Sequence, residues 1–226
     1  MIKAIIFDLD DVIVNSSPKH FEAYEKALGD FGIKVPKISG ALRRDIYGMR
    51  IKEIMELLVR EFRMDVDVAE LTKHRNAYFM ELVKEGVEAM PGLYKLVDDI
   101  TKWGLKRAVA SSGVRDYVEA VLEQLDIQDF FEGIVTGDDV KNPKPAPDCF
   151  LMAAKKMGIE PKYCAVIEDS THGLNAAKKA GMLAIGVKNS MVDSDQDMSP
   201  ADIVVNRLDE IKFPLQLWLE GKRLNK

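Results

Sequence analysis

The sequence is poor in the residues that build zinc sites and disulfide frameworks, with only two cysteines and three histidines among 226 residues. Cys149 and Cys164 lie far apart and no CxxC pair occurs, so a zinc site is not expected. Both thiols are expected to be buried and reduced, which is typical of a cytoplasmic protein.

Long apolar runs and an excess of basic charge are also missing. No run approaches the roughly 18 residues of a membrane span, and the short N-terminal run ends in acids without a cleavage site, so no signal peptide is predicted. The net charge of -5 provides no basic field for nucleic acid. We therefore expect a cytoplasmic protein, a monomer or weak homodimer, that acts on a small molecule without a nucleic-acid or membrane partner.

Short apolar segments recur along the chain and predict strands that are buried on both faces of a parallel sheet. They are Ala4–Phe7, Arg107–Ala110, Ile134–Val135, Ala165–Ile167, Leu183–Val187 and Ile203–Val205. Between them, apolar residues recur at helical spacing, and two such stripes end at Gly158 and Gly181, as helices commonly do. The alternation predicts a doubly wound, Rossmann-like α/β fold.

Residues 17–88 break this alternation, because they contain helical patterns without a strand candidate. The patterns cover Phe21–Leu28, Ile51–Phe62 and Val68–Val83. So much helix exceeds a simple crossover between parallel strands. We therefore predict an inserted all-helical cap domain at 17–88 and an α/β core domain made of 1–16 and 89–226. The polar segment Asn189–Ala201 is predicted to be a surface loop.

Side chains able to do chemistry follow four of the predicted strands, at the edge where parallel sheets bind ligands. They are Asp8 and Asp10, Ser111 and Ser112, Lys144, and Glu168 and Asp169. Carboxylates from two strands suit a divalent cation such as Mg²⁺, while hydroxyl and ammonium groups suit phosphate oxygens. One carboxylate could attack phosphorus and a second could transfer protons. Alone, each signal has a simpler interpretation; Ser112, for instance, could cap a helix.

Four motifs resemble those of the haloacid dehalogenase-like hydrolase superfamily, in particular its β-phosphoglucomutase-like or phosphoglycolate phosphatase-like branch. They read FDLDDVIVNS, VASS, NPKPAPDCF and VIEDSTHGLNAAKKAGM, and they span nearly the whole predicted core. The helical insertion lies where this branch carries its cap, between the first and second motifs.

The resemblance implies a role for each matching position. Asp8 would be the nucleophile that becomes an aspartyl-phosphate, and Asp10 the general acid and base, with its backbone carbonyl on Mg²⁺. Ser111 and Lys144 would hold the phosphoryl group, and we add Ser112 to this phosphate-binding set.

The same resemblance implies metal ligands and a cap contact. Asp8, Asp10 and Asp169 would bind Mg²⁺, and Glu168 would do so directly or through water. His20 matches a position that touches substrate in the mutases, although an exposed helical histidine is an equal interpretation.

Two positions depart from the family pattern. Asp11 stands where the family usually has glycine, and aspartate tolerates a positive φ better than most residues. We expect Asp11 to point away from the metal and to cap the turn. Asn15 stands where the branch often has aspartate; it keeps a hydrogen-bonding oxygen and removes a charge.

The motifs predict a Mg²⁺-dependent phosphatase of a small phosphorylated metabolite, such as a sugar phosphate or a phosphoglycolate-like compound. The alternative is a β-phosphoglucomutase-type phosphomutase, which would bind a second phosphate with cap cations. Candidates for that role are Arg50, Lys52, Lys73 and Arg75, although such charges usually form a solvated helix face.

Other functions fit the sequence less well. Asp10 and the Glu168-Asp169 pair disfavour a haloacid dehalogenase, and Asp10 also disfavours a phosphonoacetaldehyde hydrolase. A phosphoryl-accepting receiver would lack the helical insertion. An inactive binding module would lack a catalytic position, and none is missing here.

Overall fold

The computed structural model describes residues 1–37, 39–188 and 196–215. Six parallel strands form one sheet in the order β3-β2-β1-β4-β5-β6. The predicted doubly wound α/β fold is therefore confirmed. Most of the predicted surface loop Asn189–Ala201 lies outside the described residues.

The strands fall on the predicted segments, within a residue or two at their ends. They are β1 Ala4–Phe7, β2 Lys106–Ala110, β3 Gly133–Val135, β4 Cys164–Glu168, β5 Leu183–Val187 and β6 Ile203–Val205. Strand β1 lies between β2 and β4, with Phe7 paired to Val109 on one side and to Ile167 on the other. The strand order reverses at β1, and such a switch point is where ligands bind in open parallel sheets.

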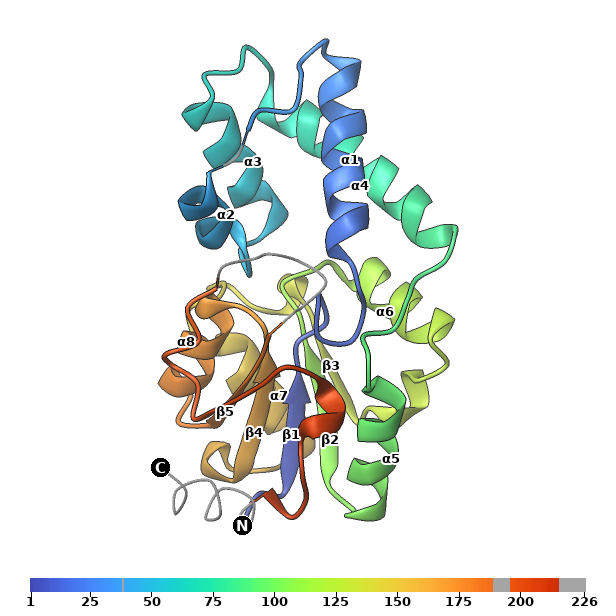
Figure 1. The fold of residues 1–226 in the computed structure, drawn as a ribbon, viewed down its shortest axis with the longest axis vertical. Helices are drawn as coiled ribbons and strands as arrows, with labels where there is room; N and C mark the ends of the chain where they lie inside the picture. The colour runs from blue at the N-terminus through green and yellow to red at the C-terminus, as the bar shows by residue number, and fades with distance from the viewer. Residues whose placement is uncertain (38, 189–195, 216–226) are drawn as a thin grey trace.

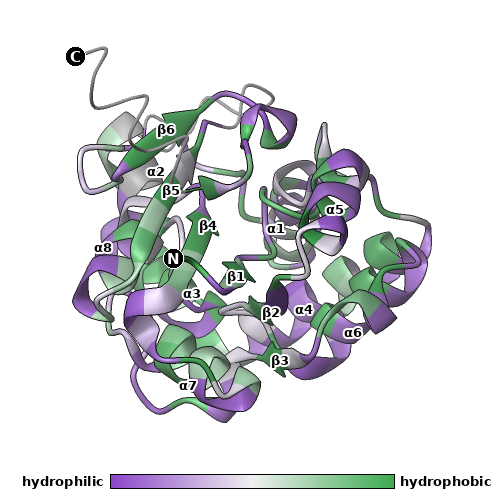
Figure 2. Ribbon diagram, turned by 90° about the horizontal axis from the view of Figure 1, so that it is seen from below, coloured by the Kyte–Doolittle hydropathy of each residue, from purple (hydrophilic) through white to green (hydrophobic). Residues whose placement is uncertain are grey.

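Helices cover both faces of the sheet (Figure 2). They are α5 Leu93–Lys102 and α6 Arg115–Gln124 on one face, and α7 Asp148–Met157 and α8 Thr171–Lys179 on the other. Side chains of a strand alternate between faces, so Ile5 and Phe7 join the core under α5 and α6, while Ala4 and Ile6 join the core under α7 and α8. Burial on both faces explains why β1 is apolar throughout.

Between β1 and α5, the described residues form helices, called the cap below, and no strand. These helices are α1 Ser17–Asp30, α2 Gly40–Ile46, α3 Ile51–Glu61 and α4 Val68–Lys84. They lie over the carboxyl end of the sheet (Figure 1) and share a small apolar core of their own. The sequence did not reveal α2, which is short, although the Ser39 hydroxyl caps it by accepting from the amide of Leu42. The exact domain boundaries stay a prediction.

Two backbone segments join the helices to the sheet, and they pair with each other. Val14 forms a bridge with Ala89, and the amide of Asn15 donates to the carbonyl of Glu88 at 2.8 Å. The two crossings thus form one narrow connection next to the end of β1, called the hinge below. Among the described residues, no helix is both long and apolar enough to cross a membrane.

Candidate active site

The predicted lysine joins two of the predicted carboxylates at the carboxyl end of the sheet. The Lys144 Nζ donates to Asp8 Oδ1 at 2.5 Å and to Glu168 Oε1 at 2.8 Å. All three residues are buried, with at most 7% of their surface exposed. Asp8 and Glu168 follow or end neighbouring strands β1 and β4, so the sheet fixes their spacing and the loop after β3 brings Lys144 between them.

The charges of this cluster perturb one another strongly. Burial lowers the pKa of Lys144, but the charges of Asp8 and Glu168 raise it by more, so the lysine remains protonated. Burial raises the pKa of Asp169 well above its usual value, and the carboxylates of Glu168, Asp11 and Asp8 raise it further. One ammonium therefore does not balance the acids gathered at this edge.

Asp10 is held by donors from both parts of the molecule. The Tyr117 hydroxyl on α6 donates to Asp10 Oδ1 at 2.6 Å, and the His20 Nε2 on α1 lies 3.3 Å from the same oxygen. Burial raises the pKa of Asp10, but the hydrogen bonds from His20 and Tyr117 lower it by more, leaving the pKa at about 2. His20 stacks on Phe79 with ring centroids 4.2 Å apart, so it is not the exposed histidine of the simpler interpretation.

Arg75 corrects the expectation that the cap cations form a solvated helix face. It is 2% exposed, with its guanidinium over the rings of Tyr24 and Phe79, and it bonds the Nδ1 of His20. Among the described residues, no carboxylate lies within ion-pair distance of it, and its Nε has no hydrogen-bond partner. Lys52 and Lys73 are exposed as expected.

Asp11 ties the loop after β1 to α1. It has a φ of 55°, and its Oδ1 accepts from the backbone amides of Ser16 and Ser17, both at 3.2 Å. Its other oxygen accepts from the Ser17 hydroxyl. Burial raises the pKa of Asp11 to about 6. Asp11 thus accepts hydrogen bonds as a cap, but its partner is the start of α1 rather than the turn, and its orientation away from a metal stays a prediction.

The segment between α2 and α3 contacts the core. Two predicted site residues, Arg50 and Ser112, form hydrogen bonds in this contact. The Arg50 Nη2 donates to the carbonyls of Gly137 at 3.0 Å and Val140 at 2.5 Å. The Ser112 hydroxyl donates to the Gly48 carbonyl at 3.0 Å. The helix-capping interpretation of Ser112 is wrong, since the N-cap of α6 is Val114. Phosphate binding by Ser112 and substrate binding by Arg50 stay predictions.

Ser111 directly follows the last residue of β2, the strand that pairs with β1, and only 1% of it is exposed. Its Oγ accepts from the amide of Gly113 at 3.0 Å, which shapes the turn that leads into α6. The structure thus brings Asp8, Ser111 and Lys144 to the same edge, as predicted.

The acids that the structure describes at this edge do not form a complete metal site by themselves, but Mg²⁺ needs only a few protein ligands. Within the described residues, no three His, Cys, Asp or Glu side chains are grouped so as to hold a metal. Both oxygens of Glu168 are engaged, one by Lys144 and the other by Ser170. Mg²⁺ keeps several waters and needs only one or two carboxylates beside substrate phosphates, which Asp8 and Asp169 can supply, together with the backbone carbonyl of Asp10.

Two residues of the site escaped the sequence interpretation. Tyr117 stands within an ordinary amphipathic helix pattern, which gave no sign that its hydroxyl meets Asp10. Gly173 on α8 belongs to the fourth motif, and a Cβ at this position would lie 1.6 Å from Glu168 Oε1. Any side chain at position 173 would therefore occupy the space that the Glu168 carboxylate fills, which only the packed structure shows.

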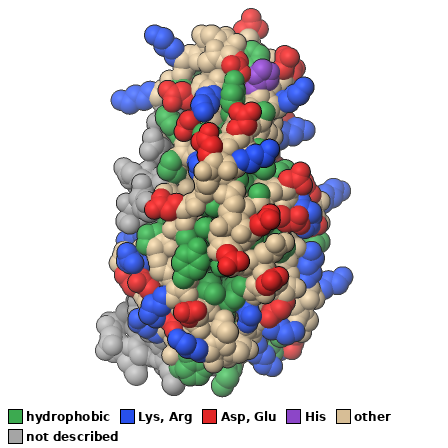
Figure 3. Space-filling model, turned by 90° about the vertical axis from the view of Figure 1, so that its right-hand side faces the viewer, with side chains coloured by type: hydrophobic (Ala, Val, Ile, Leu, Met, Phe, Trp, Pro, Cys, Tyr) green, Lys and Arg blue, Asp and Glu red, His purple; other side chains and the backbone are tan. Residues whose placement is uncertain are grey.

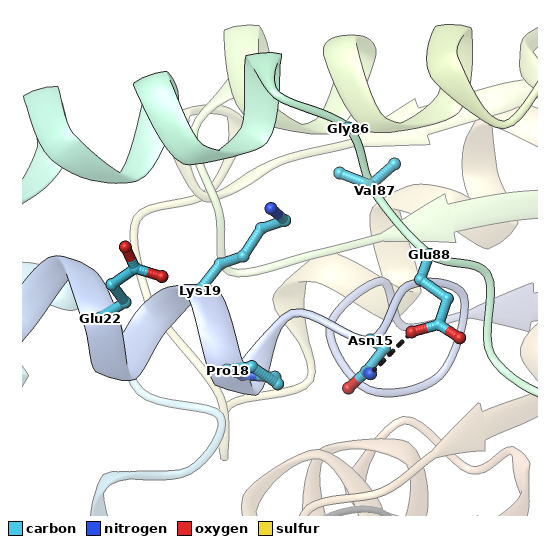
Figure 4. Close-up of a pocket in the computed structure, with 7 residues that line it drawn as sticks. All are labelled: Asn15, Pro18, Lys19, Glu22, Gly86, Val87 and Glu88. Atoms are coloured by element: carbon cyan, nitrogen blue, oxygen red, sulfur yellow. Dashed lines mark hydrogen bonds between the residues drawn. The ribbon is translucent and has the colours of Figure 1, made fainter.

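A cavity of about 320 Å³ lies on the outside of the hinge, away from the predicted catalytic residues. Lys19 and Glu22 of α1 face the segment Gly86–Glu88 across it (Figure 4). Asn15 Nδ2 donates to Glu88 Oε2 at 3.3 Å. The departure at Asn15 therefore serves the hinge, where a neutral amide can bond an acid that an aspartate would repel.

Comparisons with known proteins agree with these motifs. Residues 5–187 match the family described as haloacid dehalogenase-like hydrolase. Fructose-1-phosphate phosphatase YqaB of Escherichia coli (strain K12) is 32% identical over 186 residues, covering 81% of this chain and 95% of that protein. Beta-phosphoglucomutase of Bacillus subtilis (strain 168) is 29% identical over 221 residues, covering 95% and 93%.

A solved structure agrees over the whole chain. The crystal structure of beta-phosphoglucomutase from Clostridium difficile has a TM-score of 0.83 and 27% identity, and the match covers 100% of both chains. The chain therefore belongs to the haloacid dehalogenase-like hydrolase family, as an enzyme of its phosphatase and phosphomutase branch.

Proposed function

We propose that the protein is a Mg²⁺-dependent phosphatase that hydrolyses a small phosphorylated metabolite through an aspartyl-phosphate on Asp8. The observation that carries the proposal is the placement of three groups at one edge of the sheet. The carboxylate of Asp8 is held by Lys144 at 2.5 Å, and Asp10, two residues further along, is held separately by Tyr117. A nucleophile and a proton-transfer group are thus fixed side by side.

Asp8 attacks phosphorus, and the bond from phosphorus to the leaving oxygen breaks. Lys144 supplies positive charge beside the attacking carboxylate, which favours a negatively charged phosphoryl group there. The negative charge of a bound phosphate would raise the pKa of Asp10 from about 2 and let the carboxyl group take up a proton. Asp10 then gives this proton to the leaving oxygen and later takes one from the water that releases phosphate from Asp8. A bound Mg²⁺ would neutralise charge on the phosphoryl oxygens, held by Asp8, Asp169 and the carbonyl of Asp10.

The cap favours hydrolysis over a mutase reaction. A mutase must bind a second phosphate with cap cations, yet Arg50 is engaged with core carbonyls. Arg75 is enclosed by Tyr24, Phe79 and His20, and Lys52 and Lys73 are exposed. Among the cap cations whose side chains the structure describes, these four candidates are thus not gathered into a second phosphate site.

The relatives suggest the class of substrate. The E. coli relative is named for its activity on fructose 1-phosphate and the B. subtilis relative for its activity on phosphoglucose. We therefore propose a sugar phosphate as the first class to test, with phosphoglycolate-like compounds second.

The test is a screen for phosphate release from sugar phosphates, phosphoglycolate and nucleotides, with Mg²⁺ and after its removal by EDTA. Asp8→Asn is the matched control, because it keeps the size of the side chain and removes the nucleophile. We expect release from at least one sugar phosphate, dependent on Mg²⁺ and lost in Asp8→Asn.

Two outcomes would redirect the proposal. Interconversion of glucose 1-phosphate and glucose 6-phosphate without release of phosphate would favour the mutase. Full activity of Asp8→Asn would disprove the mechanism altogether.

A further inference from the structure

Tyr117 is a buried tyrosine whose hydroxyl points at the catalytic loop. It is 3% exposed, and its hydroxyl donates to Asp10 Oδ1 at 2.6 Å across 107 positions of sequence. A buried hydroxyl that meets a carboxylate at this distance forms a strong, charge-assisted hydrogen bond. The residue comes from α6 of the core, so this contact joins α6 to the loop after β1.

The second donor to Asp10 reaches the same oxygen. A guanidinium can only donate, so the bond between Arg75 and the His20 Nδ1 makes Nδ1 an acceptor and leaves the proton on Nε2. His20 Nε2 then donates to Asp10 Oδ1 at 3.3 Å. Two donors converge on Oδ1, and neither of them binds Oδ2.

Packing fixes the ring of Tyr117 independently of its hydroxyl. Its ring lies 4.8 Å from that of Phe79 and 6.3 Å from that of His20, both in edge-to-face geometry. Phe79 belongs to α4 and His20 to α1. The ring of Tyr117 therefore packs against the cap, while its hydroxyl bonds Asp10 in the core. Removing the hydroxyl alone would therefore leave the ring in place.

We propose that Tyr117 is a positioning residue that holds Oδ1 of Asp10, so that Oδ2 is the oxygen that exchanges protons with the substrate. The inference rests on the proposed phosphatase function and adds a residue to it. In the first step, the bond from phosphorus to the leaving oxygen breaks, its electron pair stays on that oxygen, and the proton of Oδ2 moves there. Without the Tyr117 hydroxyl, the Asp10 carboxyl can rotate, and this proton transfer is misaligned.

The leaving group distinguishes this role from a structural one. An alkoxide leaves poorly unless it is protonated, whereas p-nitrophenolate leaves without a proton. We would measure kcat/KM of Tyr117→Phe with p-nitrophenyl phosphate and with the alkyl phosphate that the wild-type protein hydrolyses fastest. We expect a loss of about tenfold or more for the alkyl phosphate, little change for p-nitrophenyl phosphate, and a nearly unchanged KM.

Two further variants complete the experiment. Tyr94→Phe is the matched control, because it removes a hydroxyl whose one hydrogen bond within the described residues goes to the carbonyl of Leu125. Both substrates should be hydrolysed as by the wild type. In an Asp10→Asn background, Tyr117→Phe should not lower kcat/KM any further, since Tyr117 acts through Asp10.

The possible results separate the two proposals. Equal losses for both substrates, no loss at all, or a full further loss in the Asp10→Asn background would overturn the role of Tyr117 and leave the phosphatase function standing. If the wild-type protein hydrolysed neither substrate, the proposed function would fail and the inference with it.

Discussion

At the scale of single residues, Lys144 holds together the carboxylates at the carboxyl end of the sheet. Lys144 has two carboxylates within 2.8 Å, and removing one partner from such a buried group typically destabilises a protein by about 3–5 kcal/mol. Glu168 is equally constrained, since its oxygens bond Lys144 on one side and Ser170 on the other. The positions around these side chains therefore tolerate little change in volume.

Gly173→Ala should disable the site by displacing Glu168. The new Cβ would lie 1.6 Å from Glu168 Oε1, so the carboxylate must leave its place beside Lys144. We expect kcat to fall by about 10²-fold or more, and the free energy of unfolding to fall by about 1–3 kcal/mol from overpacking, measured by phosphate release and urea denaturation.

Gly29→Ala is the control for this change, because nothing lies within 4 Å of a Cβ built at Gly29. It should leave both quantities unchanged or raise stability slightly. A Gly173→Ala protein with wild-type activity would show that Glu168 need not contact Lys144.

At the scale of single elements, two aspartates hold the starts of helices by accepting hydrogen bonds that the sequence pattern does not reveal. The start of α1 is satisfied by Asp11, which stands six residues before Ser17. The loop after β3 is tied to α6 by Asp139, which accepts from the amide of Thr136 and, with both of its oxygens, from the Arg115 Nη2.

Asp11→Gly should weaken the attachment of α1 without affecting the metal. Glycine accepts the φ of 55° but removes the acceptors for the amides of Ser16 and Ser17. We expect a loss of about 1 kcal/mol in the free energy of unfolding and a small change in the Mg²⁺ concentration needed for activity. Ser17→Ala, which keeps both amide hydrogen bonds and removes the hydroxyl contacts with Asp11 and Tyr47, should cost less. A large shift in Mg²⁺ affinity in Asp11→Gly would mean that Asp11 faces the metal.

Asp139 should make part of the stability depend on pH. Partial burial raises the pKa of Asp139, but hydrogen bonds from Thr136 and Arg115 lower it by more, so the pKa lies below its usual 3.8. The stabilisation is therefore complete above pH 3.8 and is lost as the pH falls further. The difference in unfolding free energy between the wild type and Asp139→Asn should be constant near neutrality and shrink in acid. A difference that grew in acid would contradict this account.

At the scale of the whole molecule, the cap is bound to the core by backbone groups at its lower edge. Arg50 donates to carbonyls of the loop after β3, and the carbonyls of Tyr47 and Gly48 accept from His172 and Ser112. Acidic and basic side chains are interspersed over the face drawn in Figure 3, and that face carries no basic patch. The position of the cap therefore depends on the hydrogen bonds of Arg50, His172 and Ser112 and on the hinge, rather than on a large charged surface.

Gly48→Ala should disturb this contact between the cap and the core. A Cβ at Gly48 would lie 2.8 Å from the Ser170 Oγ and 3.3 Å from His172 Cβ, and the φ is 79°. We expect a lower kcat/KM and a larger radius of gyration by small-angle scattering, because the cap must lift from α8. Gly32→Ala shares the strain of a positive φ of 68° but has nothing within 4 Å, so it should change stability alone. Equal effects of the two variants on kcat/KM would argue against cap docking through Gly48.

Much of the fold and of the candidate site could be predicted, for identifiable reasons. The strands of the sheet are apolar throughout because both faces are covered, and the first segment was predicted at its observed bounds, Ala4–Phe7. Asp8, Ser111 and Lys144 meet because parallel strands end at a common edge. Helix α2 was missed because its seven residues are too few for a clear period. The buried position of Arg75 was missed because its partners are the rings of Tyr24 and Phe79.

The sequence by itself determined the family, the parallel sheet and the edge at which the acids gather, because strand burial and motif spacing are written in local patterns. Only the tertiary structure decided what each polar group contacts. It turned Ser112 and Arg50 to the contact between cap and core, enclosed Arg75, brought Tyr117 to Asp10, and gave Asp11 the start of α1 as its partner. Such contacts join residues far apart in the chain, and their geometry is set by how helices and loops pack together.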